Sequence, residues 1–227
     1  MSDLNPAELP LWVQDRDTVI STEKDVEWRY QQPPDYSRQN EFFKKESQFN
    51  YPESSLEAIV HNLVRTFEME ASYKTNPEQW LSIVADKFQI STNGGPVFKA
   101  QDVVEQGTYN LFIGETKDYS PSAETFESSA QLFHTAFPNG FLWELTEILS
   151  GPPKVTFKWR HWGTFSGSYK DHTPTGETVE IFGVTIAKVT EDLKILSMEH
   201  FFDNSSFLSK LTKGCPFHAQ NKTEEMQ

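Results

Sequence analysis

Three runs near the C-terminus decide the fold: VTFKWRHWGTFSG at 155–167, PTGETVEIFGVTIAKV at 174–189 and LKILSMEHFFDNSSFLSKL at 193–211. Each run is rich in β-branched and aromatic residues, and turns rich in Gly, Asp or Glu separate them, which is typical of antiparallel strands. Ionisable side chains are set among the rings, namely Arg160, His161, Glu199, His200 and Asp203. This mixture is unusual in solvated strands and is typical of an apolar cavity with a few titratable groups.

The elements expected before these runs are mostly helical. Ser55 can cap a helix from about 56 to 74, in which Ile59, Leu63 and Phe67 recur at helical spacing. Further expected elements are a short helix at 77–84, a strand at 86–92, helices at 100–112 and 123–137, a strand at 142–150 and a helical turn at 206–211. Helices followed by consecutive antiparallel strands predict an α+β fold.

The chain divides into four expected parts. Residues 1–27 are charged and aperiodic and are expected to form a flexible arm. Residues 28–53 are irregular but rich in rings, which predicts an extension wrapped over the domain. Residues 54–212 form the expected domain, and residues 213–227 form a flexible tail.

Composition excludes several classes of function. The formal net charge of −13 is unsuited to nucleic acid or to anionic membrane surfaces, both of which need a basic face. The single cysteine, Cys215, excludes an internal disulfide framework, as expected in a reducing compartment. The N-terminus lacks the pattern of a signal peptide, and no apolar run approaches the ~20 residues of a membrane span, so we expect a cytoplasmic protein.

Strand alternation orders the candidate catalytic residues. Trp159 and His161 share one face of their strand, and Arg160 and Trp162 share the other. An inward His161 could move protons near neutral pH, or it could be a buried structural histidine.

On the last strand, Glu199 and Asp203 share one face, and His200 and Phe202 share the other. Two carboxylates beside a ring suit acid–base chemistry, because burial and mutual repulsion separate their pKa values. The alternatives are that Glu199 pairs with a neighbouring basic residue and that Asp203 caps the following turn.

The remaining polar candidates carry weaker signals. Asn93 ends a strand and could orient a water, although a turn role explains it better. Glu68 and Glu70 are expected to be one solvated and one half-buried residue. The chain has no P-loop, GxGxxG, HExxH, GxSxG or paired CxxC motif and no metal-ligand spacing, so we expect neither cofactor nor metal.

Residues 28–212 resemble a known family. The matching motifs include Trp28-Arg29-Tyr30, Tyr51-Pro52-Glu53, Phe67-Glu68-Met69-Glu70 and Phe157-Lys158-Trp159-Arg160-His161-Trp162-Gly163. With them the chain resembles the "pathogen-related protein" group of plants and fungi, within the SnoaL-like, nuclear-transport-factor-like superfamily. The resemblance implies a cone-shaped cavity walled by a curved antiparallel sheet and by the first helices. It also implies a homodimer, since related folds often dimerise through the sheet.

The resemblance implies two mechanisms, and the chain departs from both. SnoaL-like polyketide cyclases use a carboxylate on the final strand, where this chain has His200 flanked by Glu199 and Asp203. Relatives that hydrolyse epoxides use an Asp–Arg–Asp arrangement, whereas here Arg160 is followed by Trp162 in place of the second Asp.

The sequence therefore favours a cofactor-free enzyme of secondary metabolism that acts on an apolar, polyketide- or terpenoid-like substrate. The expected chemistry is epoxide opening by water or by an internal hydroxyl, or the cyclisation of an ester by an aldol-type or ether-forming reaction. Glu199 or Asp203 would be the acid or base, His161 or His200 its partner, and Arg160 an oxyanion or carboxylate contact. The substrate wall would consist of Trp159, Trp162, Tyr109, Tyr169 and Phe202. The alternatives are a non-catalytic ligand-binding stress protein and a dimerising scaffold with a filled core.

Overall fold

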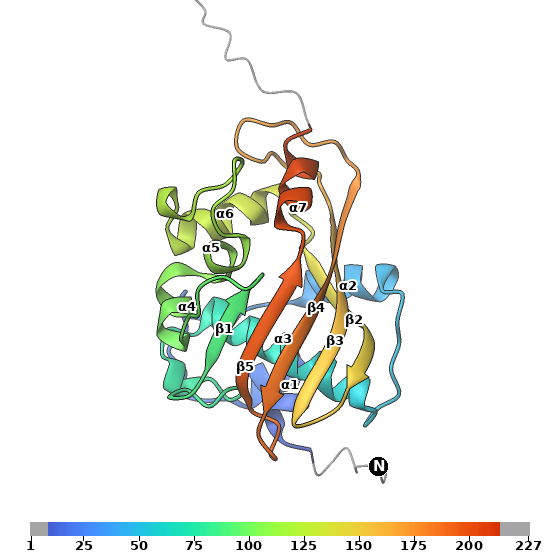
Figure 1. Ribbon diagram of the computed structural model, residues 1–227. Helices are drawn as coiled ribbons and strands as arrows, with labels where there is room; N and C mark the ends of the chain where they lie inside the picture. Colours follow the sequence, from blue (N-terminus) through green and yellow to red (C-terminus); the bar gives the residue numbers. More distant parts are fainter. Residues whose placement is uncertain (1–8, 214–227) are drawn as a thin grey trace, which may run out of the picture.

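The computed structural model describes residues 9–213 of the chain. A five-stranded sheet has the order β1-β5-β4-β3-β2, and Figure 1 shows helix α3 passing behind it. The strands are β1 (Gln89–Thr92), β2 (Leu142–Ser150), β3 (Lys154–Thr164), β4 (Thr178–Val189) and β5 (Ile195–Phe202). The helices are α1 (Arg16–Thr22), α2 (Ser37–Glu46), α3 (Leu56–Tyr73), α4 (Ala100–Gln106), α5 (Thr108–Ile113), α6 (Phe126–Ala136) and α7 (Asn204–Leu211). The α+β fold expected from the sequence is confirmed.

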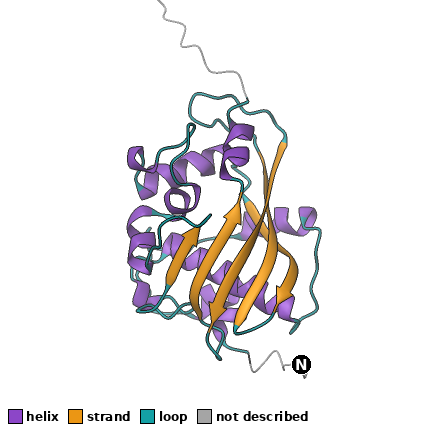
Figure 2. Ribbon diagram, in the orientation of Figure 1, coloured by secondary structure: helices purple, strands orange, loops and turns teal. Residues whose placement is uncertain are grey.

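Strands β2 to β5 are consecutive antiparallel neighbours, and β1 joins the edge at β5 in parallel. The register places Trp159 opposite Gly183 and His161 opposite Ile181. Helices lie behind the sheet and beside its β1 edge, as Figure 2 shows. We call the helix-covered face of the sheet the inner face and the opposite face the outer face.

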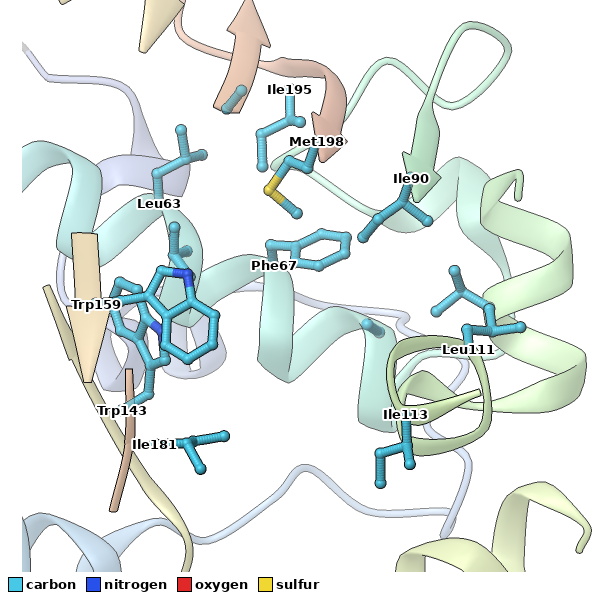
Figure 3. Packing of buried hydrophobic residues seen from close by; sticks show 14 of the residues in the cluster. Leu63, Phe67, Ile90, Leu111, Ile113, Trp143, Trp159, Ile181, Ile195 and Met198 are labelled. Carbon is cyan, nitrogen blue, oxygen red and sulfur yellow. The ribbon is translucent and has the colours of Figure 1, made fainter. Parts of the chain in front are cut away.

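Helix α3 is the main partner of the inner face. The Ser55 hydroxyl accepts the Ala58 N–H at 3.1 Å, which is the expected N-cap. The apolar side of α3 meets the side chains of the sheet, and Figure 3 shows Phe67 of α3 next to Met198 of β5. Burial of this face supplies the main stabilisation of the helix, because propensity alone is weak in water.

Two expected helices are shorter than the sequence predicts. The helix expected at 100–112 is broken into α4 and α5 at Gly107, whose φ is +84°. A Cβ at Gly107 would lie 2.9 Å from the Phe126 ring, so both backbone and packing require glycine there. The helix expected at 77–84 is one 3₁₀ turn, Pro77–Gln79.

The expected flexible arm is wrong for the residues of α1. Asp15 caps α1 by accepting the Asp17 N–H at 2.9 Å, and Val13 and Val19 are buried against the domain. The extension at 28–53 is also more regular than expected, because it contains α2. The expected tail, including Cys215, lies almost wholly outside the described residues, and the division of the chain into four parts stays a prediction.

A buried ion pair ties the N-terminal segment to α3. Lys74 Nζ donates to Glu70 at 2.8 Å and to Glu23 at 2.6 Å, and the Glu70 carboxylate also accepts the Leu81 and Ser82 N–H groups. Glu70 is fully buried, so the expectation that it is at most half-buried is corrected. Within residues 9–213, no helix is both long and apolar enough to cross a membrane.

Candidate functional site

A cavity of about 250 Å³ lies between the inner face of the sheet and the helices. We call it the inner cavity. Its wall is mostly aromatic and aliphatic and includes Phe67, Tyr109, Phe112, Phe141, Trp143, Phe157, Trp159, Ile181 and Phe202. The volume is slightly below the ~300 Å³ at the lower end of common ligand sites, so the cavity suits a small ligand.

The sheet supplies two histidines to this wall. His161 from β3 and His200 from β5 both line the inner cavity, as the alternation of each strand requires. Burial lowers the pKa of His161 to about 3 and that of His200 to about 4. Both rings are therefore neutral at pH 7, and each can hydrogen-bond a ligand without carrying charge.

A short relay fixes the His200 ring. The Trp159 indole N–H donates to Thr185 Oγ1 at 2.8 Å, and Thr185 Oγ1 lies 2.7 Å from His200 Nδ1. Because the hydroxyl already accepts from Trp159, its own proton is available to donate to His200 Nδ1. When the hydroxyl donates in this way, the proton of the neutral imidazole is on Nε2, which has no hydrogen-bond partner among the described residues.

Glu68 is the carboxylate of the inner cavity. Its Oε1 lies 3.8 Å from His161 Nε2, beyond hydrogen-bond distance, and no described residue hydrogen-bonds its side chain. Desolvation raises the pKa of Glu68 to about 7, although Arg16 and Arg65 act in the opposite direction. Near neutral pH the group can therefore both give and take a proton.

Two arginines complete the polar end of the cavity. Arg16 from α1 and Arg65 from α3 line it beside Glu68. Each is close to Asn40 of α2, with Arg–Asn distances of 3.4 Å and 3.0 Å. Burial lowers the pKa of Arg65 to about 10, and the nearby Arg16 charge acts in the same direction.

Five of the residues expected at the site line the inner cavity: His161, His200, Trp159, Tyr109 and Phe202. Tyr109 comes from α5, where its ring stacks on Phe133 at 4.3 Å, and burial raises its pKa. The structure brings these residues together, and their roles in catalysis or binding stay predictions.

The two carboxylates expected to be catalytic do not reach the cavity. Glu199 lies on the outer face, where it lines a separate groove with Lys154 and Lys188. Asp203 is exposed and caps α7 by accepting the Ser206 N–H at 2.8 Å. Their positions follow from alternation, since His200 points inward and its two flanking carboxylates cannot.

Arg160 and Trp162 also lie outside the cavity, on the outer face. Arg160 donates to Glu144 at 2.6 Å and to Glu180 at 2.7 Å, and Trp162 donates to Glu46 at 2.8 Å. These contacts use the guanidinium and the indole in a buried structural network. They correct the expectation that Arg160 contacts substrate and that Trp162 forms its wall.

The last two candidate site residues, Tyr169 and Asn93, have structural roles. Tyr169 is fully buried beside Phe133 and is absent from the cavity lining. Asn93 sits at φ +52° and exchanges two hydrogen bonds with the Phe202 backbone, at 2.9 Å and 3.0 Å. Asn93 therefore holds the end of β1 against β5, which is a structural role in a turn.

Sequence reasoning missed Glu68, Arg65 and Arg16. The signal for Glu68 was its place four residues after Val64 and directly after the inward Phe67, at the flank of the apolar face of α3. Arg16 was missed because its segment was taken for an arm. Over residues 9–213, no group of three His, Cys, Asp or Glu side chains could hold a metal ion.

The fold and cavity define an α+β protein with a twisted sheet that encloses an inner-face site. No family model matches the chain. A pathogen-related protein of Hordeum vulgare is 37% identical over 210 residues, which cover 86% of this chain and 89% of that protein. The chain therefore belongs to the pathogen-related protein family, as its motifs indicate.

Solved structures add a likeness of shape. A protein named as a polyketide cyclase from Acidithiobacillus ferrooxidans is 13% identical, with a TM-score of 0.43 over 73% of this chain and 100% of that chain. A protein named as a SnoaL-like polyketide cyclase from Jannaschia sp. CCS1 is 12% identical, with a TM-score of 0.39 over 74% of this chain and 100% of that chain. At these scores nothing about chemistry follows from the likeness.

Proposed function

We propose that this protein binds a small, mostly apolar molecule in the inner cavity and catalyses a proton-transfer reaction on it, with Glu68 as the acid–base group. The observation that carries the proposal is the position of Glu68, a carboxylate with a pKa of about 7 facing neutral His161 inside an aromatic cavity. A group that titrates near the working pH is the most effective proton carrier. Functional sites are where such perturbed pKa values gather.

The proposed reaction is the opening of an epoxide, by water or by a hydroxyl of the same molecule, or the related cyclisation of an ester. In the hydrolysis, the oxygen of water forms a bond to the epoxide carbon while the epoxide C–O bond breaks. The proton of water passes to ionised Glu68, which returns it to the alkoxide oxygen. Neutral His161, 3.8 Å from Glu68, can hydrogen-bond the water or the departing oxygen. The aromatic wall supports a polyketide- or terpenoid-like substrate.

The second candidate is a non-catalytic ligand-binding protein that uses the same cavity. The observation in its favour is that, among the residues described, Glu68 is the one carboxylate that lines the cavity. The expected second carboxylate is absent from the wall because Glu199 and Asp203 lie elsewhere. A mechanism that needs two carboxylates is therefore not supported by this wall.

The substitution Glu68→Gln separates the two candidates. The assay follows consumption of a panel of aryl and alkyl epoxides and lactones by mass spectrometry, and it measures binding by quenching of Trp143 and Trp159, which line the cavity. For an enzyme, the variant loses ~10²- to 10⁴-fold in turnover and keeps its affinity. The matched control is Glu199→Gln on the outer face, which keeps wild-type turnover. Equal turnover by Glu68→Gln and wild type contradicts the assigned role, and binding without turnover by wild type supports the carrier.

A further inference from the structure

The two arginines of the inner cavity converge on one acceptor. The Arg16 and Arg65 guanidiniums each place an NH2 nitrogen within hydrogen-bond distance of Asn40 Oδ1, at 3.4 Å and 3.0 Å. They come from α1 and α3, and Asn40 comes from α2, so three elements bring the two positive groups together. Within the described residues, neither arginine has a carboxylate at ion-pair distance.

Arg16 is the more deeply buried of the pair. Its exposed fraction is 7%, its guanidinium lies 3.3 Å from the centroid of the Tyr36 ring, and its Nε is buried without a hydrogen-bond partner. A desolvated guanidinium with an unused donor is costly unless an acceptor completes it. The acids whose charges act on Arg65 are Asp15, Glu68 and Asp17, and no described hydrogen bond or ion pair joins any of them to either guanidinium.

We infer that Arg16 and Arg65 bind the carboxylate of a small apolar acid, whose remaining atoms lie against the aromatic wall. The inference rests on the proposed function in that it uses the same cavity. Guanidiniums match the geometry of a carboxylate and bind it through charge-assisted hydrogen bonds. Both side chains line the cavity, and the guanidinium nitrogens that reach it without bonding a described residue supply the donors.

The chemistry of the site favours a single negative charge. Glu68 lies on the same wall as the two arginines, so when it is ionised the three groups together carry one net positive charge, which matches a monoanion better than a doubly charged group such as a phosphate. The apolar wall of Phe67, Trp143 and Trp159 excludes a strongly hydrated ligand. The cavity of about 250 Å³ limits the acid to a small one. The ligand class is therefore a small aromatic or alicyclic monocarboxylate.

Calorimetric titration with phenylacetate and its neutral analogue phenylacetamide tests this inference on the unaltered chain. Wild type is expected to bind the acid about 10- to 100-fold more tightly than the amide, the gain of a charge-assisted pair. Arg65→Met is expected to remove that preference while affinity for the amide changes less than about twofold. The matched control is Arg38→Met on α2, an exposed arginine outside the cavity lining, which keeps the preference.

The outcomes separate this inference from the proposed function. Equal binding of acid and amide by wild type overturns carboxylate recognition and leaves the cavity as a binding site for neutral molecules. Binding of neither probe overturns carboxylate recognition, and the Glu68→Gln assay then decides the proposed function separately. If Arg65→Met fails to fold, as judged by circular dichroism, the wild-type comparison still decides, and Arg16→Gln provides the second variant. Retention of the acid preference by folded Arg65→Met and folded Arg16→Gln overturns the assignment of these residues.

Discussion

The two sides of the sheet pair their ionisable side chains in opposite ways. On the outer face, Arg160 is held by Glu144 and Glu180 at 2.6 and 2.7 Å, and Glu144 also accepts from Ser47 and Gln48. On the inner face, Glu68, Arg16 and Arg65 line one cavity, and none of them has an ion pair with an acid or base within hydrogen-bond distance.

The difference separates structure from function. A charged group whose hydrogen bonds are all made within the protein has few left for a ligand. The Arg160 network is of this kind, and it holds the end of α2 and the segment after it against the sheet. Ionisable groups that line a cavity and that the protein leaves incompletely paired, such as Glu68, Arg16 and Arg65, are free to contact a ligand. The inner face is therefore the candidate for chemistry, although the outer face has the more conspicuous Arg–Glu pairs.

The largest expected effect is on the outer face. Arg160→Met leaves Glu144, whose side chain is 1% exposed, buried without its partner, and we expect a loss of about 3–5 kcal/mol in the free energy of unfolding. Lys158→Met on the same strand removes an exposed pair with Glu147 and should cost about 0–1 kcal/mol. Arg65→Met should lower the free energy of unfolding by about 1 kcal/mol, since the substitution removes one hydrogen bond to the neutral amide of Asn40. Urea unfolding measures all three. A loss for Arg65→Met as large as that for Arg160→Met would remove the distinction between the faces.

The next effect is a change in the pH dependence of stability. Burial lowers the pKa of His200 in the folded protein to about 4, below its ordinary value of 6.5. As the pH falls, the unfolded chain therefore binds the proton before the folded protein does. The stability that comes from keeping His200 neutral in the fold is present above pH 6.5 and is lost as the pH falls toward 4. His200→Asn removes it, so the variant should lose roughly 2–3 kcal/mol less than wild type between pH 7 and pH 4. Thermal unfolding followed across this range measures the slope, and parallel curves for the two proteins would show that His200 titrates normally.

A smaller effect is expected where the cavity wall meets β4. A Cβ at Gly183 would lie 2.2 Å from Cζ2 of Trp159, so Gly183→Ala must displace the indole and its bond to Thr185. We expect a loss of about 1–3 kcal/mol from overpacking and weaker binding of any ligand in the cavity. In the control Gly151→Ala, the new Cβ meets Leu56 at 3.4 Å, and stability should change by less than about 0.5 kcal/mol. Urea unfolding with tryptophan fluorescence reports both changes, and unaltered fluorescence in Gly183→Ala would contradict the packing described.

Much of the fold could be predicted from the sequence because strand and helix patterns are local. The alternation in 155–162 placed Trp159 and His161 on one face and Arg160 on the other, and the structure has this arrangement. Ser55 could be predicted as an N-cap for the same reason. The break at Gly107 was not, because it depends on the Phe126 ring nineteen residues further on.

The site was predicted only in part because its polar residues come from distant elements. Alternation could show that Glu199 and His200 oppose each other, but it could not show which of them faces the helices. Glu68 acquires its raised pKa from the cavity that surrounds it and from no feature of its own helix. Arg16 becomes a site residue only because α1 packs on α3, a contact that no local pattern in residues 1–27 reveals.

The most direct test of the account is the titration of the Glu68 carboxyl, followed by its side-chain ¹³C chemical shift in the free protein, with Glu68→Gln used to assign the resonance. Because desolvation dominates at this position, we predict a midpoint at a pH of about 7. A midpoint near the ordinary value of 4.5 would show a hydrated carboxylate and would contradict the assignment of the inner cavity as the site of proton transfer.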